Sequence, residues 1–244
     1  MLVKTLCLSG ALLISASVFA ASDVHWAYSG DDGPDNWAKL SPDYSACSGK
    51  NQSPVNLADF TEADLPPIKF QYIKGARDIV NNGHSIQVNF DRRSSIIIDG
   101  ETFNLIQYHF HAPSENHING KSYPMEAHFV HSDENGNLLV IALMFEEGAE
   151  NKSLTKVWEH MPEKAGDKNE LTDVVSANEL LPKNRDYYRF NGSLTTPPCT
   201  EGVRWLVFKE PVYASKKQID DFRRVMRHPN NRPIQPTNAR LILR

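Results

Sequence analysis

Gln107-Tyr108-His109-Phe110-His111, answered by Glu126-Ala127-His128, is the stretch that decides the fold of this chain. Alternate side chains of an extended strand share one face, so we expect His109 and His111 on the same face, about 7 Å apart along the backbone. The residues between the two motifs are rich in Pro, Ser, Asn and Gly and can return the chain on an adjacent antiparallel strand. His128 would then lie on the same face as the first two histidines.

The three histidines together form a candidate metal site. Neutral imidazoles on one rigid sheet face can hold Zn²⁺ and leave its fourth tetrahedral position open, which is typical of catalytic rather than structural zinc. Two other interpretations remain open from these residues alone. Each histidine could be an ordinary polar residue of a strand, and Glu126 could be a fourth ligand that closes the metal to substrate.

Residues 1–20 have the pattern of a signal peptide. Lys4 provides the positive start, residues 6–19 are mostly apolar, and Val18-Phe19-Ala20 is a small-x-small cleavage signal. The apolar run is too short to span a bilayer, and an uncleaved anchor is the alternative. We therefore expect one mature domain over residues 21–244, periplasmic or secreted, with no membrane insertion after cleavage.

The charge balance and the cysteines limit the partners and the compartment. The chain has 26 Lys and Arg against 30 Asp and Glu, a net charge of −4 that becomes −5 once Lys4 is removed. This mild acidity, without a basic cluster, argues against nucleic acid as a partner. Cys47 and Cys199 remain after signal removal, and in an exported chain they most simply form one disulfide; two unpaired buried thiols are the alternative.

Short β-rich runs dominate the rest of the sequence, separated by turn signals such as Asn135-Gly136. Helical patterns are few: Asn151–His160, and Ser215–Met226, where Ser215 and Gln218 fit a capping box. No linker-like change in composition divides the chain. We therefore expect one mainly β (α+β) domain, an antiparallel sheet with peripheral helices. The expected strands are Ile68–Tyr72, Ser85–Asp91, Ser94–Ile98, Thr102–His111, Met125–Ser132, Leu138–Phe145 and Val203–Phe208.

A series of short motifs extends over nearly the whole mature chain: His25-Trp26-Ala27-Tyr28, Gly33-Pro34-Asp35-Asn36-Trp37, Gln52-Ser53-Pro54-Val55-Asn56-Leu57, Asn81-Asn82-Gly83-His84, Gln107-Tyr108-His109-Phe110-His111, Ser114-Glu115, Met125-Glu126-Ala127-His128-Phe129-Val130-His131, Gly192-Ser193-Leu194-Thr195-Thr196-Pro197-Pro198 and Asn231-Arg232-Pro233-Ile234-Gln235-Pro236. In this order and spacing they resemble the α-class carbonic anhydrases, of the exported bacterial type. The resemblance implies that family's fold, a central, largely antiparallel ten-stranded twisted sheet with peripheral helices and a conical cavity that reaches the zinc.

Carried over to this chain, the resemblance implies a zinc lyase that interconverts CO₂ and bicarbonate. His109, His111 and His128 would be the ligands, and a zinc-bound hydroxide would attack CO₂. A ligating imidazole is usually held in one tautomer by a partner on its other nitrogen. The partners that the family implies are Gln107 for His109, Glu126 for His128 and the backbone carbonyl of Asn230 for His111.

The resemblance also assigns the residues that handle protons. Thr195 and Glu115 would orient the hydroxide, because a threonine hydroxyl that donates to a carboxylate can only accept a hydrogen bond from the zinc-bound hydroxide. The Thr195 N–H would donate to the developing oxyanion. His84 would be the proton shuttle, since an imidazole that titrates near neutral pH can take and give a proton. Without the family, His84 would be an ordinary exposed histidine at a turn. The solvent network would include Tyr28, Asn82 and Gln87.

CO₂ is apolar, so the resemblance gives it an apolar site, although each residue there could also be ordinary core. Phe190 departs from the family, which often has tyrosine at this position. The phenolic OH of that tyrosine would be missing here from the hydrogen-bond network around the threonine, with a modest effect on rate. Tyr188 is close in sequence. The implied substrate-binding residues are Val130, Val140, Leu194, Thr195, Thr196, Val203 and Trp205.

Two other classes of function fit the same fold. One is a binding module like the acatalytic carbonic-anhydrase-related proteins, which typically lose a ligand histidine, whereas all three are present here. The other is a zinc hydrolase of esters, for which no second general acid is evident. The implied partners are CO₂, bicarbonate and water; a homodimer is compatible with the sequence, which does not fix the oligomeric state. Asn-x-Ser sequons at Asn151 and Asn191 leave a eukaryotic secretory origin open.

Overall fold

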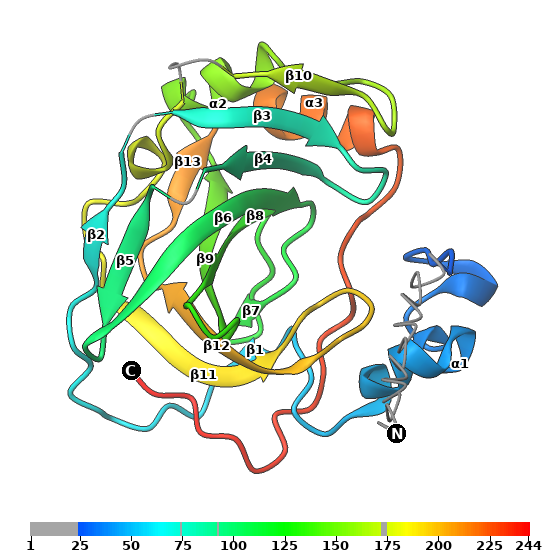
Figure 1. Ribbon diagram of the computed structural model, residues 1–244, viewed down its shortest axis with the longest axis vertical. Helices are drawn as coiled ribbons and strands as arrows, with labels where there is room; N and C mark the ends of the chain where they lie inside the picture. Colours follow the sequence, from blue (N-terminus) through cyan, green and yellow to red (C-terminus); the bar gives the residue numbers. More distant parts are fainter. Residues whose placement is uncertain (1–23, 74, 92, 172–174) are drawn as a thin grey trace, which may run out of the picture.

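A large twisted β-sheet dominates the described part of the chain, residues 24–73, 75–91, 93–171 and 175–244 of a computed structural model (Figure 1). Within those residues the sheet has eleven strands, and its main path runs β10–β3–β4–β6–β8–β9–β12–β11. The expected signal peptide, residues 1–20, lies outside the described residues. The strands are β2 (Lys69–Gln71), β3 (Ala76–Asn81), β4 (Ile86–Phe90), β5 (Ser95–Ile98), β6 (Glu101–His111), β8 (Met125–Ser132), β9 (Leu138–Glu147), β10 (Lys168–Glu170), β11 (Tyr187–Ser193), β12 (Glu201–Phe208) and β13 (Val212–Ala214). A separate two-stranded sheet pairs β1 (Asn56–Leu57) with β7 (His117–Ile118).

Most strand pairs in the large sheet are antiparallel, and the parallel ones are β9 with β12 and β9 with β13. The mainly β prediction is therefore confirmed, and all seven expected strands are present with small shifts at their ends. Within the described residues the large sheet has eleven strands rather than the ten that the resemblance implied; β2, β10 and β13 have only three residues each. Strands β3 and β11 were not predicted, because charged residues such as Arg77 and Arg189 interrupt their apolar pattern, and the short strands β1, β7, β10 and β13 were not predicted either.

The predicted return of the chain after His111 is confirmed. Strand β8 runs antiparallel to β6, and the register places His109 directly opposite His128. Strand β9 then continues from β8 as a hairpin, and Gly136 in the connection has a φ of +84°, a conformation that glycine adopts at little cost. The central strands therefore rigidly fix the histidines relative to one another.

The sheet separates two apolar clusters, and β9 contributes to both of them. Leu139, Ile141 and Leu143 pack into the larger cluster, which also holds residues of the helices, while Val140 and Ala142 pack into a smaller cluster on the opposite face. This alternation follows from the two-residue repeat of a strand that is buried on both faces. The three histidines lie on the face of the smaller cluster, since His128 pairs with Ala142.

Helices are few and peripheral, as predicted: α1 (Trp37–Leu40), α2 (Lys152–Trp158), α3 (Lys216–Met226) and the 3₁₀ turns η1 (Gly30–Asp32), η2 (Pro42–Ser48) and η3 (Ala177–Glu179). The predicted capping box is confirmed, because the Ser215 hydroxyl accepts from Gln218 N while the Gln218 side chain accepts from Ser215 N. Trp158 of α2 stacks on Phe222 of α3, and both helices lie against one end of the sheet (Figure 1). Among the described residues no helix has the length and apolar character that a membrane crossing requires.

The N-terminal segment is fastened to the rest of the molecule by covalent and polar contacts. The predicted disulfide between Cys47 and Cys199 is present and links residues 152 positions apart. The buried guanidinium of Arg232 donates to Gln52 Oε1 at 2.8 Å, to the Ser53 carbonyl at 2.8 Å and to the Cys47 carbonyl at 3.0 Å. These contacts hold the first and last parts of the chain together beside the loop that contains Cys199.

Candidate metal centre

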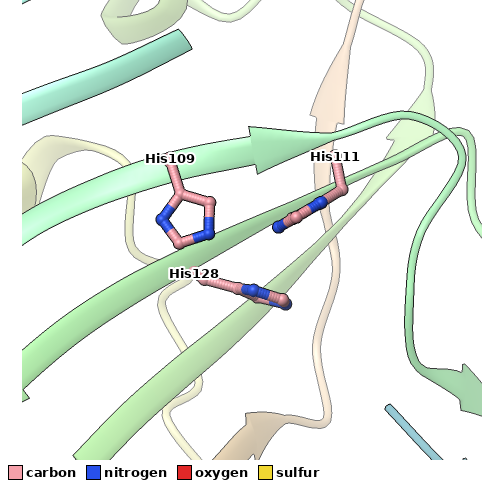
Figure 2. Close-up of side chains that lie close together, drawn as sticks. All are labelled: His109, His111 and His128. Carbon is pink, nitrogen blue, oxygen red and sulfur yellow. The ribbon is translucent and has the colours of Figure 1, made fainter. Parts of the chain in front are cut away.

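Three histidine rings from two neighbouring strands converge on one space (Figure 2). His109 and His111 come from β6 and His128 from β8, and one ligand nitrogen from each lies within 4.8 Å of the others. His111 and His128 are buried, and His109 is half-buried. Among the described residues these three form the only such cluster of His, Cys, Asp and Glu side chains.

The other nitrogen of each ring lies close to an oxygen atom that can only accept. Gln107 Oε1 lies 2.9 Å from His109 Nδ1, and Glu126 Oε1 lies 2.9 Å from His128 Nε2. The Asn230 carbonyl lies 2.7 Å from His111 Nδ1. An acceptor fixes the proton on the nitrogen that faces it, so the nitrogen that faces the common space carries a lone pair.

The electrostatics of the site favour neutral imidazoles. Burial lowers the pKa of His109 and of His128 well below the ordinary value, and the neighbouring histidines lower both further. Burial also lowers the pKa of His111, against the opposing effects of the Asn230 carbonyl and Glu126. Metal binding requires neutral imidazoles, so the three rings are in the protonation state that a metal needs.

One orphaned atom favours a metal site over three ordinary polar histidines. His111 Nε2 is buried and has no hydrogen-bond partner. A buried polar atom without a partner costs free energy, and a metal ion in the common space would satisfy it. The donor set therefore fits a metal ion, and three imidazoles are a set that zinc prefers.

Glu126 does not face the common space, so it is not a fourth ligand. Its Oε2 accepts from the backbone N–H of Glu115 at 2.7 Å and of Asn116 at 2.9 Å, and its Oε1 accepts from Asn116 Nδ2 at 2.8 Å. These contacts hold the carboxylate behind His128. Sequence reasoning did not identify Asn116, whose only signal was its place directly after Ser114-Glu115.

Glu115 approaches the histidines from another direction. Its Oε1 accepts from the Arg232 backbone N–H at 2.8 Å, and its Oε2 lies 3.5 Å from His111 Nε2 and 3.8 Å from His128 Nδ1. Burial raises the pKa of Glu115 to about 8, while hydrogen bonding from Arg232 and Thr195 acts in the opposite direction. Oε2 itself is buried and has no hydrogen-bond partner of good geometry. Thr195 therefore lies within reach of the carboxylate that the resemblance paired with it.

The sheet face around the histidines is polar on one side and apolar on the other. Cross-strand pairs place Gln87 beside His109 and Asn89 beside Gln107 on the β4 side. On the β8–β9–β12 side, Val130, Val140 and Trp205 pair in one row. The apolar side is completed by Val203, which is buried, and by Leu194, which packs against the same cluster.

The loop after β11 lies at the apolar side. Thr195 is buried and Thr196 is half-buried. Leu194 N donates to the Thr200 carbonyl at 3.0 Å, and Trp205 Nε1 donates to the Ser193 carbonyl at 3.0 Å. The loop is thus held at both ends, next to the residues that the resemblance assigned to the substrate.

His84 lies at the turn between β3 and β4, as expected, but it is less free than the sequence suggested. Its ring stacks on Trp26, with centroids 3.7 Å apart and planes within 9°, and it is half-buried rather than exposed. Burial lowers the pKa of His84, and the neighbouring His25 and His228 lower it further. Tyr28 lies edge-on at 6.4 Å. Sequence reasoning gave Trp26 no role, although it belongs to the first motif.

Phe190 and Tyr188 lie on β11, and their surroundings differ. Phe190 is buried and its ring is parallel to Trp205, with centroids 5.9 Å apart. Tyr188 stacks on Phe60 at 4.5 Å.

His131, three residues after His128, is buried on the opposite face of the sheet, where its Nε2 lies 2.6 Å from the Tyr72 hydroxyl. His131 therefore points away from the other three histidines.

Comparison with known proteins gives a consistent result. The model of the eukaryotic-type carbonic anhydrase family matches residues 32–244. A carbonic anhydrase of Pectobacterium carotovorum is 50% identical over 239 residues, which cover 97% of this chain and 98% of that protein. A carbonic anhydrase of Neisseria gonorrhoeae is 47% identical, with 97% and 96% covered. The solved structure of an α-carbonic anhydrase from Thermovibrio ammonificans with the inhibitor sulfanilamide superimposes with a TM-score of 0.89 at 54% identity, covering 91% of this chain and 99% of that one.

Proposed function

The chain belongs to the eukaryotic-type, or α-class, carbonic anhydrase family, and from this premise we propose that it catalyses the zinc-dependent, reversible hydration of CO₂ to bicarbonate and a proton. The observation that carries the proposal is the set of three histidines whose outer nitrogens face acceptors while their inner nitrogens converge. His109, His111 and His128 would hold the metal. The small-molecule substrates would be CO₂, bicarbonate and water.

Bound there, Zn²⁺ would act as a Lewis acid and bring the pKa of water to near neutrality, an effect for which carbonic anhydrase is the standard example. The protein contributes ligand orientation. Gln107, Glu126 and the Asn230 carbonyl fix the three imidazole tautomers, so each ring offers its lone pair without a rearrangement.

Thr195 and Glu115 orient the attacking oxygen. When Glu115 is ionised, a threonine hydroxyl that donates to its carboxylate keeps only its lone pairs for a partner, so that partner must donate its own hydrogen and turn a lone pair toward CO₂. The backbone contact from Arg232 to Glu115 Oε1 leaves Oε2 as the acceptor for Thr195. The Thr195 N–H is the donor for the oxygen that becomes negative.

The apolar side of the histidine-bearing face binds CO₂. Val130, Val140, Leu194, Val203 and Trp205 present hydrocarbon there, with Thr195 and Thr196 at its edge. His84 carries the proton away: its imidazole nitrogen accepts the proton from solvent and gives it to buffer. Water between His109 and His84 is ordered by Tyr28, Asn82 and Gln87. Phe190 brings no hydroxyl to this network, and Tyr188 packs on Phe60, so neither residue replaces the tyrosine that the family often has.

The disulfide supports an oxidising compartment. With the signal-peptide pattern at residues 1–20, this leads us to propose that the mature protein is residues 21–244 and acts in the periplasm or after secretion.

Stopped-flow CO₂ hydration by the purified mature protein, with and without a zinc chelator, tests the proposed function. We expect hydration that is lost on metal removal and restored by added zinc. A folded protein that binds zinc but does not hydrate CO₂ would support the binding-module alternative, and ester cleavage without CO₂ hydration would support the hydrolase alternative.

Changing His84 to Ala should slow turnover in weak buffer, and added imidazole should restore it. An unchanged rate would remove His84 from the mechanism.

A further inference from the structure

A chain of side-chain hydrogen bonds leads away from the turn that carries His84 and ends at a buried carboxylate. Asn82 Nδ2 donates to Gln87 Oε1 at 3.4 Å, and Gln87 Nε2 donates to Asn89 Oδ1 at 2.7 Å. Asn89 Nδ2 then donates to Asp78 Oδ1 at 2.5 Å. The chain crosses from β4 to β3, where the register places Asp78 opposite Asn89.

The direction of this chain is fixed at both ends. Asn82 Oδ1 accepts from the backbone N–H of His84 at 2.9 Å and of Ser85 at 2.7 Å, so the Asn82 amide must turn its nitrogen toward Gln87. At the other end an ionised carboxylate can only accept, so Asn89 must turn its nitrogen toward Asp78. Each amide between the two ends has one orientation that satisfies both neighbours. Each amide also keeps a second N–H, which can donate to water.

The carboxylate at the end of the chain is well defined. Asp78 is 2% exposed. Its Oδ2 accepts from Arg77 Nε at 2.7 Å and lies 3.8 Å from Lys168 Nζ, so Oδ1 is left for Asn89. Burial alone would raise the pKa of Asp78, but the hydrogen bonds from Asn89 and Arg77 and the two positive charges outweigh it and lower the pKa below the ordinary value. Asp78 is therefore ionised at neutral pH.

The chain lies where proton transfer needs it. Gln87 pairs directly with the metal-ligand candidate His109, and Asn82 holds the backbone of His84. In the proposed mechanism, water between these two histidines would meet the amides of Gln87 and Asn82. Asp78 lies two links beyond Gln87 and, within the described residues, makes no hydrogen bond or ion pair with a histidine of the site.

We propose that Asp78 is a positioning residue for proton transfer: through Asn89 it sets the orientation of the Gln87 and Asn82 amides that order water between His109 and His84. This inference rests on the proposed function. The sequence analysis gave neither Asp78 nor Asn89 a role.

The test variant is Asp78→Asn, which keeps the shape of the side chain. Arg77 and Lys168 attract the remaining oxygen of the new amide, so its NH₂ group faces the NH₂ group of Asn89 and the chain can no longer run in one direction. We expect kcat in weak buffer to fall roughly two- to tenfold, the effect of about one hydrogen bond. kcat/KM for CO₂ should stay unchanged, because the proton leaves after the chemical step, and added imidazole should restore kcat.

A matched control and a second break in the chain separate positioning from general structure. Asp91→Asn is the matched control, because Asp91 is exposed, lies 3.9 Å from the Arg77 guanidinium and belongs to no link of the chain, so its kcat should equal that of the wild type. Asn89→Ala breaks the chain one link nearer the site and should reproduce the effect of Asp78→Asn. The double variant of Asp78 and Asn89 should be no slower than either single variant, since both changes break one chain.

A second readout does not depend on activity. In ¹H–¹⁵N spectra of the zinc-free protein, Asp78→Asn should shift the side-chain NH₂ signals of Asn82 and Gln87, whereas Asp91→Asn should leave them in place. An unchanged kcat in weak buffer, unchanged NH₂ signals, or an equal fall of kcat and kcat/KM in Asp78→Asn would each overturn the inference. Absence of zinc-dependent hydration in the wild type is a different outcome, which refutes the proposed function and this inference with it.

Discussion

Replacing Glu126 with Gln should weaken zinc binding although Glu126 is not a ligand. The carboxylate accepts on both oxygens: Oε2 from two backbone N–H groups and Oε1 from Asn116 Nδ2, with His128 Nε2 at 2.9 Å from Oε1. A glutamine has only one accepting oxygen. The two backbone N–H groups would keep that oxygen as their acceptor, so the new NH₂ group would face Asn116 and His128.

The size of the effect follows from two separate losses. At His128, an NH₂ group donates to Nε2 and moves the imidazole proton to Nδ1, the atom that faces the other two histidines, so that atom loses its lone pair. Loss of such an orienting partner lowers metal affinity roughly 10- to 100-fold, or about 1.4–2.7 kcal/mol. At Asn116, one buried donor loses its acceptor, which should lower the stability of the zinc-free protein by about 1–3 kcal/mol.

Competition with a chelator of known affinity measures the first loss, and urea unfolding of the zinc-free protein measures the second. Glu101→Gln is the matched control, because Glu101 is exposed and lies at the opposite end of β6 from the histidines; it should change neither quantity. A zinc dissociation constant for Glu126→Gln within about twofold of the wild type would refute the tautomer argument. A weaker zinc affinity without any loss of zinc-free stability would refute the assignment of the Asn116 contact.

Three other expected outcomes test different parts of the molecule. Changing both Cys47 and Cys199 to Ser should lower the free energy of unfolding by about 5 kcal/mol, since the disulfide closes a loop of 152 residues; equal denaturant midpoints with and without the bond would contradict this. Burial lowers the pKa of His131 to about 4 from 6.5. This side chain therefore contributes stability that is present above pH 6.5 and is lost, by about 3 kcal/mol, as the pH falls toward 4. In His131→Phe the free energy of unfolding, measured in urea, should depend less on pH over that range, and an unchanged pH dependence would show that His131 does not titrate as described. Thr195→Ala should reduce CO₂ hydration roughly 10- to 1000-fold, measured by stopped flow, and near wild-type hydration would remove Thr195 from the orienting role.

The candidate ligands were predictable because the information is local. His109 and His111 are two residues apart, and strand alternation alone places both on one face. His128 requires only that the chain returns on the neighbouring strand, which the turn-forming residues in between favour. The observed register, His109 opposite His128, agrees with this argument.

The groups that hold the ligands were less predictable. Gln107 and Glu126 are each two residues from the histidine that they contact, so alternation permits the contact. The carbonyl of Asn230 reaches His111 across 119 residues, and the N–H of Arg232 reaches Glu115 across 117. Only the resemblance pointed to Asn230, and nothing in the sequence pattern pointed to the contact of Arg232.

The sequence by itself determined seven strands of the large sheet, the zinc-type spacing of its histidines, the cysteine pair and the family. These features depend on side-chain alternation and on local turns, which a few adjacent residues specify. The tertiary structure alone decided that His84 stacks on Trp26, that His111 Nε2 has no other partner, and that a chain of amides ends at Asp78. Such contacts join strands and loops distant in sequence, and they form only where packing brings a donor and an acceptor together at hydrogen-bond distance.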